Sequence, residues 1–224
     1  QGLLDVGKAM HGPGKFRQDW DLAIDDDACA DLTDQTCNVW SNDISGPGGL
    51  NKTGSGILTL SGKNSYRGIT DIAEGELHIA GELNGSDITI SDGLLNINAS
   101  GKVTNTTTLI KDGQLLAAGN MRSTDMRVEN GLLNVDSTGL VNTNNTVLKG
   151  GKIDMAGAFL SDQLRVQGGS LSIQINGKVN SSKTYIEGGK LYVAGELNGS
   201  DITLSGGLLN INASGKVTNT TTLI

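Results

Sequence analysis

Two cysteines and two histidines are the residues of this chain that most readily support metal or redox chemistry. Seven residues separate Cys29 from Cys37. A zinc site needs two further ligands, and His11 and His78 have no metal-like spacing with the pair. A redox pair normally has the spacing Cys-x-x-Cys. The pattern therefore favours a small-loop disulfide formed in an oxidising compartment, with no bound metal.

Carboxylates cluster around the cysteines. The run comprises Asp21, Asp25, Asp26, Asp27, Asp31 and Asp34. Hard cations such as calcium favour clustered carboxylates, but neither the EF-hand spacing nor the glycine-rich calcium repeat is present. The favoured interpretation is a solvated acidic loop, with calcium binding left as an open alternative.

No set of residues in the chain has the pattern of a catalytic site. With only two histidines, no Ser-His-Asp constellation can be assembled. Carbohydrate cleavage needs a carboxylate pair, whereas Asp87, Asp125 and Asp201 recur at one offset without a partner acid or base. We therefore expect no catalytic residue, cofactor or small-molecule ligand in these 224 residues.

Composition restricts both the partners and the core. The net charge of −7 argues against binding to nucleic acid or to an anionic membrane, and no apolar run is long enough for a transmembrane helix. Aromatic residues make up only 3% of the chain, so the core must be aliphatic. Hydrophobic residues, at 36%, are spread evenly, which suits a thin and elongated core.

An internal repeat dominates the sequence after residue 74. Glycines recur at intervals that alternate between 18 and 20 residues, at Gly75, Gly93, Gly113, Gly131, Gly151, Gly169, Gly189 and Gly207. A second glycine follows in every unit, and the two extra residues of the longer units always fall between the two glycines. Residues 79–110 and 193–224 match at 29 of 32 positions, at an offset of 114. Each glycine is expected at a corner of a repeating coil.

Alignment of the units produces apolar columns. The column two residues after the first glycine contains Leu77, Leu95, Leu115, Leu133, Ile153, Leu171, Leu191 and Leu209. Apolar residues also fill the positions four after the first glycine and two and nine after the second. Inward residues at every second position indicate short strands, not helices. The sequence therefore predicts an all-β, right-handed parallel β-helix with alternating 18- and 20-residue coils, about 45 Å long.

Two segments resemble a known family. Residues 2–14 read GLLDVGKAMHGPG, and residues 38–62 read NVWSNDISGPGGLNKTGSGILTLSG. These segments resemble, respectively, the region after the peptidase domain and the start of the passenger-associated repeat in subtilisin-like (S8 family) serine protease autotransporters. The resemblance implies a junction over residues 1–44 and a β-helix stalk over residues 45–224. Autotransporter passengers usually have few, closely spaced cysteines, which agrees with a disulfide.

The resemblance also implies a location and neighbouring domains. It points to a secreted or surface-exposed bacterial protein, with a serine protease upstream and an outer-membrane barrel downstream. The chain starts abruptly and stops within the repeat, so we expect it to be a fragment of a longer protein. The subtilase triad motifs are absent from it. The predicted function is that of a stalk and a scaffold for folding during secretion.

The alternative function is self-association through polar ladders. Asn, Ser and Thr recur at one place in alternate coils, so stacking would create an amide and hydroxyl surface. The candidate residues are Asn105, Thr107, Asn144, Asn145, Ser182, Lys183, Asn219 and Thr221. Such residues are also common on β-helices merely because they stack well and stay soluble. On the self-association hypothesis, the partner is the same protein on another cell.

Overall fold

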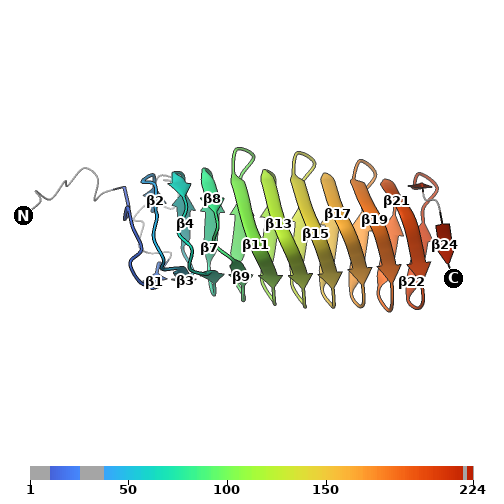
Figure 1. The fold of residues 1–224 in the computed structure, drawn as a ribbon, viewed down its shortest axis with the longest axis horizontal. Coiled ribbons are helices and arrows are strands. Elements are labelled where there is room, and N and C mark those ends of the chain that lie inside the picture. The colour runs from blue at the N-terminus through green and yellow to red at the C-terminus, as the bar shows by residue number, and fades with distance from the viewer. Residues whose placement is uncertain (1–10, 26–37, 219–220, 224) are drawn as a thin grey trace, which may run out of the picture.

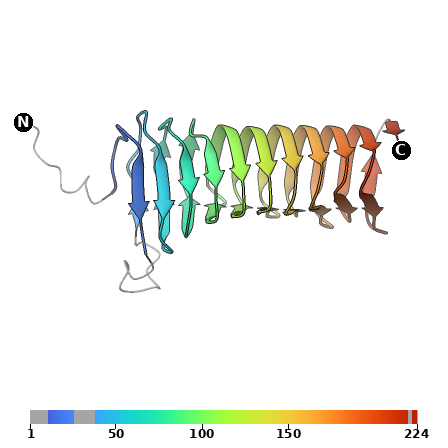
Figure 2. The same ribbon diagram turned by 90° about the horizontal axis from the view of Figure 1, so that it is seen from below.

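The chain forms a rod of parallel strands stacked coil upon coil (Figure 1 and Figure 2). The computed structural model describes residues 11–25, 38–218 and 221–223. Within these ranges there is no helix, and hence no helix that could cross a membrane. The parallel β-helix expected from the repeat is confirmed.

One side of the rod is a ten-stranded sheet of short strands. Its strands are β2 (Val39–Trp40), β4 (Ile57–Leu60), β7 (Glu76–Ile79), β10 (Leu94–Ile97), β12 (Gln114–Ala117), β14 (Leu132–Val135), β16 (Lys152–Met155), β18 (Ser170–Ile173), β20 (Lys190–Val193) and β22 (Leu208–Ile211). Successive strands pair in parallel, one coil after another. This sheet contains the first two predicted apolar columns.

The rest of each coil belongs to a fourteen-stranded sheet. Its strands are β1 (Trp20–Ala23), β3 (Leu50–Thr53), β5 (Lys63–Asn64), β6 (Thr70–Ile72), β8 (Glu82–Asn84), β9 (Ile88–Ile90), β11 (Lys102–Ile110), β13 (Asn120–Val128), β15 (Leu140–Leu148), β17 (Ala158–Val166), β19 (Lys178–Ile186), β21 (Glu196–Leu204), β23 (Lys216–Thr218) and β24 (Thr221–Leu223). The long strands β11, β13, β15, β17, β19 and β21 make up most of this sheet.

Each long strand bends near its middle. The burial pattern of β11 alternates up to Asn105, then shows two consecutive exposed residues, Thr106 and Thr107, before Thr108 turns inward. In the preceding coil two separate strands, β8 and β9, pair with the two halves of β11, and Gly85 lies between them with a φ of +92°. A coil therefore has three straight segments, two of which are joined by the bend.

The predicted columns form the core. Strand pairing places Leu95, Leu115 and Leu133 opposite one another in successive coils, and all three are fully buried. Aligned residues on the long strands, such as Val103 and Val141, are likewise buried. Full burial of one such side chain contributes about 1.5–3 kcal/mol before the loss of conformational entropy. The core is therefore a continuous and mainly aliphatic column, not a compact cluster.

A projecting turn explains the alternation of 18 and 20 residues. In the longer coils residues 98–101, 136–139, 174–177 and 212–215 form turns, and their loops project from one edge of the rod (Figure 1). The Gly101 amide donates to the Asn98 carbonyl at 2.7 Å. The Ser100 hydroxyl then donates to the Ala80 carbonyl of the preceding coil at 3.0 Å, as Thr138 does to Ala118. The two additional residues thus sit outside the stacked strands.

Glycine is required because neighbouring coils approach closely. A Cβ atom on Gly139 would lie 2.0 Å from the Ala117 carbonyl oxygen. Gly151 has a φ of +68°, which L-residues rarely adopt, and its Cβ would lie 2.2 Å from the Gly131 oxygen. A close approach of the preceding coil and a positive φ are therefore both present at these corners.

Stacking begins within the segment predicted as a junction. Strands β1 and β2 pair in parallel with β3 and β4, so residues before 45 contribute to the first coil. Phe16 and Tyr66 are fully buried, and their ring centroids lie 4.9 Å apart. The ring centroid of Trp20 lies 5.3 Å from that of Phe16. Lys52 is fully buried, and its Nζ donates to the Thr53 and Gly54 carbonyls. A pair of buried aromatic rings and a buried cation thus occur at this end of the core, whereas in the later coils Phe159 is a buried aromatic ring among mostly aliphatic residues.

Candidate functional site: the polar face of the long strands

The outer surface of the long strands carries aligned polar columns. The first outward column begins with Lys63 of β5, which lies opposite Glu82, and from β8 onward it is Glu82, Lys102, Asn120, Leu140, Ala158, Lys178, Glu196 and Lys216. The second outward column is Asn84, Thr104, Arg122, Asn142, Leu160, Asn180, Asn198 and Thr218. Because alternate residues of a strand share one side, both columns lie before the bend on the same face.

A third outward column follows the bend. It contains Thr107, Asp125, Asn145, Gln163, Lys183, Asp201 and Thr221. Asn145 Nδ2 donates to Asp125 Oδ1 at 2.7 Å, and the Thr107 amide donates to Asp87 Oδ1 at 2.8 Å. Asp87 and Asp125 therefore each bond to a neighbouring coil, which gives two of the three recurring aspartates a structural role.

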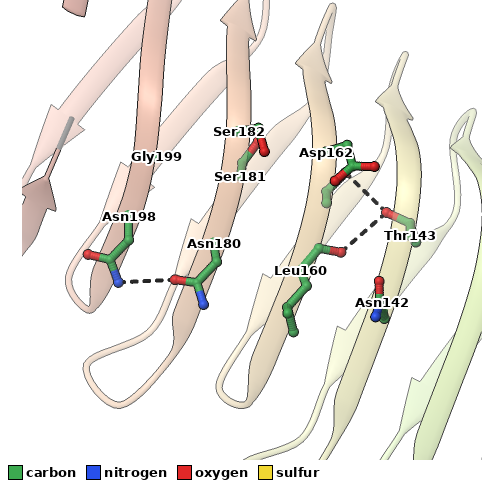
Figure 3. Close-up of a pocket in the computed structure, with 10 residues that line it drawn as sticks. Asn142, Thr143, Leu160, Asp162, Asn180, Ser181, Ser182, Asn198 and Gly199 are labelled. Atoms are coloured by element: carbon green, nitrogen blue, oxygen red, sulfur yellow. Dashed lines mark hydrogen bonds between the residues drawn. The ribbon is translucent and has the colours of Figure 1, made fainter. Parts of the chain in front are cut away.

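A shallow groove of about 440 Å³ crosses β15, β17, β19 and β21 along this surface (Figure 3). Its lining includes the amides of Asn142, Asn180 and Asn198, together with Asp162 and Ser182. Asn198 Nδ2 donates to Asn180 Oδ1 at 3.1 Å. No aromatic or basic side chain lines it. The groove therefore offers amide, hydroxyl and carboxylate groups for contact but no general acid–base pair.

Small polar residues fill the inner side of the bend. Asn105 Nδ2 donates to Thr108 Oγ1 at 2.8 Å, and Thr108 Oγ1 lies 3.0 Å from Ser123 Oγ of the next coil. Two coils further on, Thr143 Oγ1 lies 2.7 Å from Thr146 Oγ1 and donates to Ser161 Oγ at 3.1 Å. All of these residues are buried. A hydroxyl ladder thus lines the interior beneath the outward columns.

The ladder continues toward the first coils. Thr70 Oγ1 lies 2.7 Å from both Tyr66 Oη and Ser86 Oγ, and Ser86 Oγ donates to the Gly68 carbonyl at 2.7 Å. Burial raises the pKa of the Tyr66 phenol well above its ordinary value, and the bonds to Thr70 and Ser86 oppose this effect only in part. Sequence reasoning missed this network, although serine and threonine recur at fixed offsets in the columns.

The eight candidate self-association residues divide between different environments. Thr107, Asn144, Ser182, Lys183 and Thr221 are exposed. Asn145 is half-buried. Asn219 lies outside the described residues.

Asn105 lies inside the rod, contrary to its expected surface position. Only 7% of this residue is exposed. Strand pairing places Asn105 opposite Ser123 and Thr107 opposite Asp125 in the next coil. Thr106, between them, is therefore the residue of β11 that lies level with Asn144 of β15. The bend shifts the inward and outward pattern by one residue, which a strict alternation does not anticipate.

The other candidate residues that the structure describes form no centre for chemistry. Cys29, Cys37 and four of the six acidic residues lie outside the described residues. Asp21 accepts from Asn51 Nδ2 at 2.9 Å. His78 Nε2 lies 2.7 Å from Glu76 Oε2. Across the described ranges no three His, Cys, Asp or Glu side chains gather in a way that could hold a metal ion.

Comparison with known proteins links this architecture to autotransporters. Residues 50–79 match the passenger-associated transport repeat. The chain is 40% identical over 112 residues to the Neisserial autotransporter lipoprotein NalP of Neisseria meningitidis, which covers 49% of this chain and 10% of that protein. It is 59% identical over 44 residues to an extracellular serine protease of Serratia marcescens, covering 20% of this chain and 4% of that protein.

A third relative extends the comparison to an adhesin. The adhesin BmaC autotransporter of Brucella suis is 34% identical over 76 residues, which cover 34% of this chain and 2% of that protein. The chain thus spans a tenth or less of these relatives. No solved structure matches it significantly. The repeat match and the relatives support an autotransporter passenger β-helix region, with a secreted or cell-surface location.

Proposed function

We propose that this region is a non-catalytic stalk that also drives folding of the passenger during secretion. The observation that supports the proposal is the single, mainly aliphatic core that continues through the stacked coils. In such a solenoid each coil interacts mainly with its neighbours, so folding can start at one end and propagate. Each newly exported coil would then be captured by the coil before it.

We further propose that the parent is a subtilisin-like serine endopeptidase autotransporter. The motif resemblance in residues 2–14 and the similarity to the Serratia extracellular serine protease support this parentage. The protease domain would precede this region, and an outer-membrane barrel would follow it. The rod would then hold the protease away from the cell surface.

Secretion of the full-length parent tests the folding role. Leu133 is fully buried, and its neighbour Asn134 in β14 faces outward. Leu133→Asp places a charge in the core and interrupts stacking, so the amount of passenger at the cell surface should fall severalfold. Asn134→Asp adds the same charge on the outside and should leave secretion unchanged. Normal secretion of the Leu133→Asp protein would contradict the folding role.

A second candidate function is contact between rods. The exposed polar columns and the groove in Figure 3 favour it, because amides and hydroxyls in register can bond across a flat interface. Similarity to the adhesin BmaC autotransporter is consistent with a contact role. Bacteria that display the parent should clump, and charged substitutions at Asn144 and Ser182 should reduce clumping.

A further inference from the structure

The charges of the first outward column are arranged in a pattern that suits its own reversed copy. Glu82 and Lys102 lie near one end, and Lys178, Glu196 and Lys216 lie near the other. Three uncharged residues, Asn120, Leu140 and Ala158, occupy the middle. From Glu82 onward the column therefore reads, in chain order, negative, positive, three neutral, positive, negative, positive. Lys63, which precedes Glu82, lies beyond the stretch that the two copies share in the arrangement considered below.

Apolar surface gathers at the centre of the same face. Leu140 is 37% exposed and lies opposite Ala158 in the next coil. Leu160, two residues beyond Ala158 on β17, adds a half-buried apolar side chain in the second outward column. Stable contacts commonly have an apolar centre and a polar rim, and this face has both.

We propose that this face binds a second copy of the chain, with the two rods antiparallel and the two-fold axis between β15 and β17. Leu140 of each copy then packs against Ala158 of the other. Lys102 faces Glu196 of the second copy, and Glu82 faces its Lys216. The symmetry repeats each contact, so every dimer contains four opposite-charge pairs around an apolar centre. This inference rests on the second candidate function and specifies its partner and geometry.

Other arrangements of two copies are less complementary. Parallel rods related by a two-fold axis would place the first outward column against the second at equal heights, where no opposite charges meet. If the antiparallel rods slide by one coil in one direction, Lys216 of one copy faces Lys102 of the other. If they slide by one coil in the opposite direction, Glu196 faces Glu82. Like charges are therefore opposed in both cases. A slide of two coils can bring opposite charges together again. In that arrangement, however, Leu140 faces Asn120 and Ala158 faces Lys102, so the apolar residues of the two copies no longer meet.

The second outward column tolerates the proposed register. Arg122 faces Asn180 of the second copy, Leu160 faces Asn142, and Asn198 faces Thr104. No like charges are opposed in this column, and the arginine meets an amide oxygen that can accept its hydrogen bonds.

The expected pairing is weak. Eight coils at about 4.8 Å spacing and a width of about 10 Å give a contact well below about 1,200 Å² of total buried surface. Lys102 and Glu82 already lie 3.9 Å apart within one chain, and Lys178 and Glu196 lie 3.8 Å apart, all partly exposed. Pairing of such charges between copies should therefore weaken as salt rises. Many rods on one cell surface would strengthen the contact through multivalency.

Sedimentation equilibrium of the chain at low ionic strength, up to about 1 mM, tests the proposal. In the Lys102→Glu variant, the new carboxylate at position 102 faces the Glu196 carboxylate of the second copy, at two symmetric sites. In the Glu196→Lys variant, the new ammonium group at position 196 faces that of Lys102. Each variant alone should weaken dimerisation by about tenfold. An equimolar mixture of the two variants should dimerise again, because the introduced carboxylate at position 102 of one copy then meets the introduced ammonium group at position 196 of the other.

The matched control is Lys190→Glu, which makes the same charge change on the exposed side of β20 in the ten-stranded sheet. This variant should dimerise like the wild type, and mixing it with the Glu196→Lys variant should restore nothing. Circular dichroism melts confirm that each variant is folded. If wild-type chain dimerises but Lys102→Glu behaves like Lys190→Glu, the proposed register is wrong. A wild-type chain that stays monomeric at every concentration overturns the second candidate function as well.

Discussion

At the scale of single residues, Tyr66 is a titratable phenol enclosed within the rod. Tyr66 is fully buried, and its hydroxyl bonds only to other hydroxyls, through Thr70 and on to Ser86. Ionised tyrosine would lose its hydration in this environment, so burial raises the pKa of Tyr66 above its ordinary value of 10.0. The protonated phenol is therefore the form compatible with the folded rod.

This shift predicts a loss of stability in alkali. Above about pH 10 the unfolded chain releases the Tyr66 proton while the folded chain retains it, so the free energy of unfolding falls as pH rises. Tyr66→Phe should show a smaller fall than wild type between about pH 8 and about pH 11, measured by urea unfolding. Tyr192→Phe, on the outward side of β20, is the control and should keep the wild-type fall. Equal falls in wild type and Tyr66→Phe would contradict the prediction.

At the scale of the elements, the corners limit which residues can be replaced. Gly139 is the last residue of a projecting turn and precedes β15, and the Ala117 carbonyl of the preceding coil leaves no space for a methyl group. Only glycine fits at this position, because the strands of adjacent coils must stay within hydrogen-bonding distance of each other. A corner glycine thus preserves the stacking of two coils.

Gly139→Ala should therefore destabilise the rod. The added Cβ would lie 2.0 Å from the Ala117 oxygen, so either the turn or the strand pairing must shift. We expect a loss of about 1–3 kcal/mol in the free energy of unfolding, measured by denaturant titration. Gly14→Ala is the control, because its nearest neighbour would be 4.0 Å away. Similar losses for the two variants would show that close approach is not the cause.

At the scale of the whole molecule, the repeat makes the rod extendable. Residues 79–110 and 193–224 match at 29 of 32 positions, so the same coil surface recurs after 114 residues. A second copy of residues 97–210 can therefore be inserted after residue 210, because residue 97 is equivalent to residue 211 in the repeat. Each strand at the two junctions then keeps the kind of neighbour that it has in the original rod. The insertion preserves the inward and outward pattern at both junctions.

This duplication should lengthen the rod without unfolding it. Six additional coils at about 4.8 Å each add about 29 Å, which small-angle X-ray scattering can measure. The control duplicates residues 97–209 after residue 209, one residue fewer, so the strand at the junction turns its apolar residues outward. That protein should melt earlier or aggregate. Equal behaviour of the two insertions would argue against register as the controlling factor.

The sequence alone determined the coil and its core. An alternation of inward apolar residues and recurrent glycines leaves few architectures, because helices and compact sandwiches cannot repeat four apolar columns at such intervals. The columns of the repeat assign Leu133 and Val141 to the core, and both side chains are buried. The repeat period likewise identified the 18- and 20-residue coils.

Only the tertiary structure decided how the long strands bend and which polar side chains turn inward. The bend places two consecutive residues outside, and this breaks the two-residue period that sequence reasoning relies on. Asn105 consequently points into the hydroxyl ladder while Thr107 faces solvent. Local sequence does not reveal this difference, because both side chains are small, polar and acceptable on either side. Inside the rod, the Thr107 carbonyl and the Thr108 hydroxyl accept hydrogen bonds from the Asn105 amide group, and these bonds make the burial of Asn105 possible.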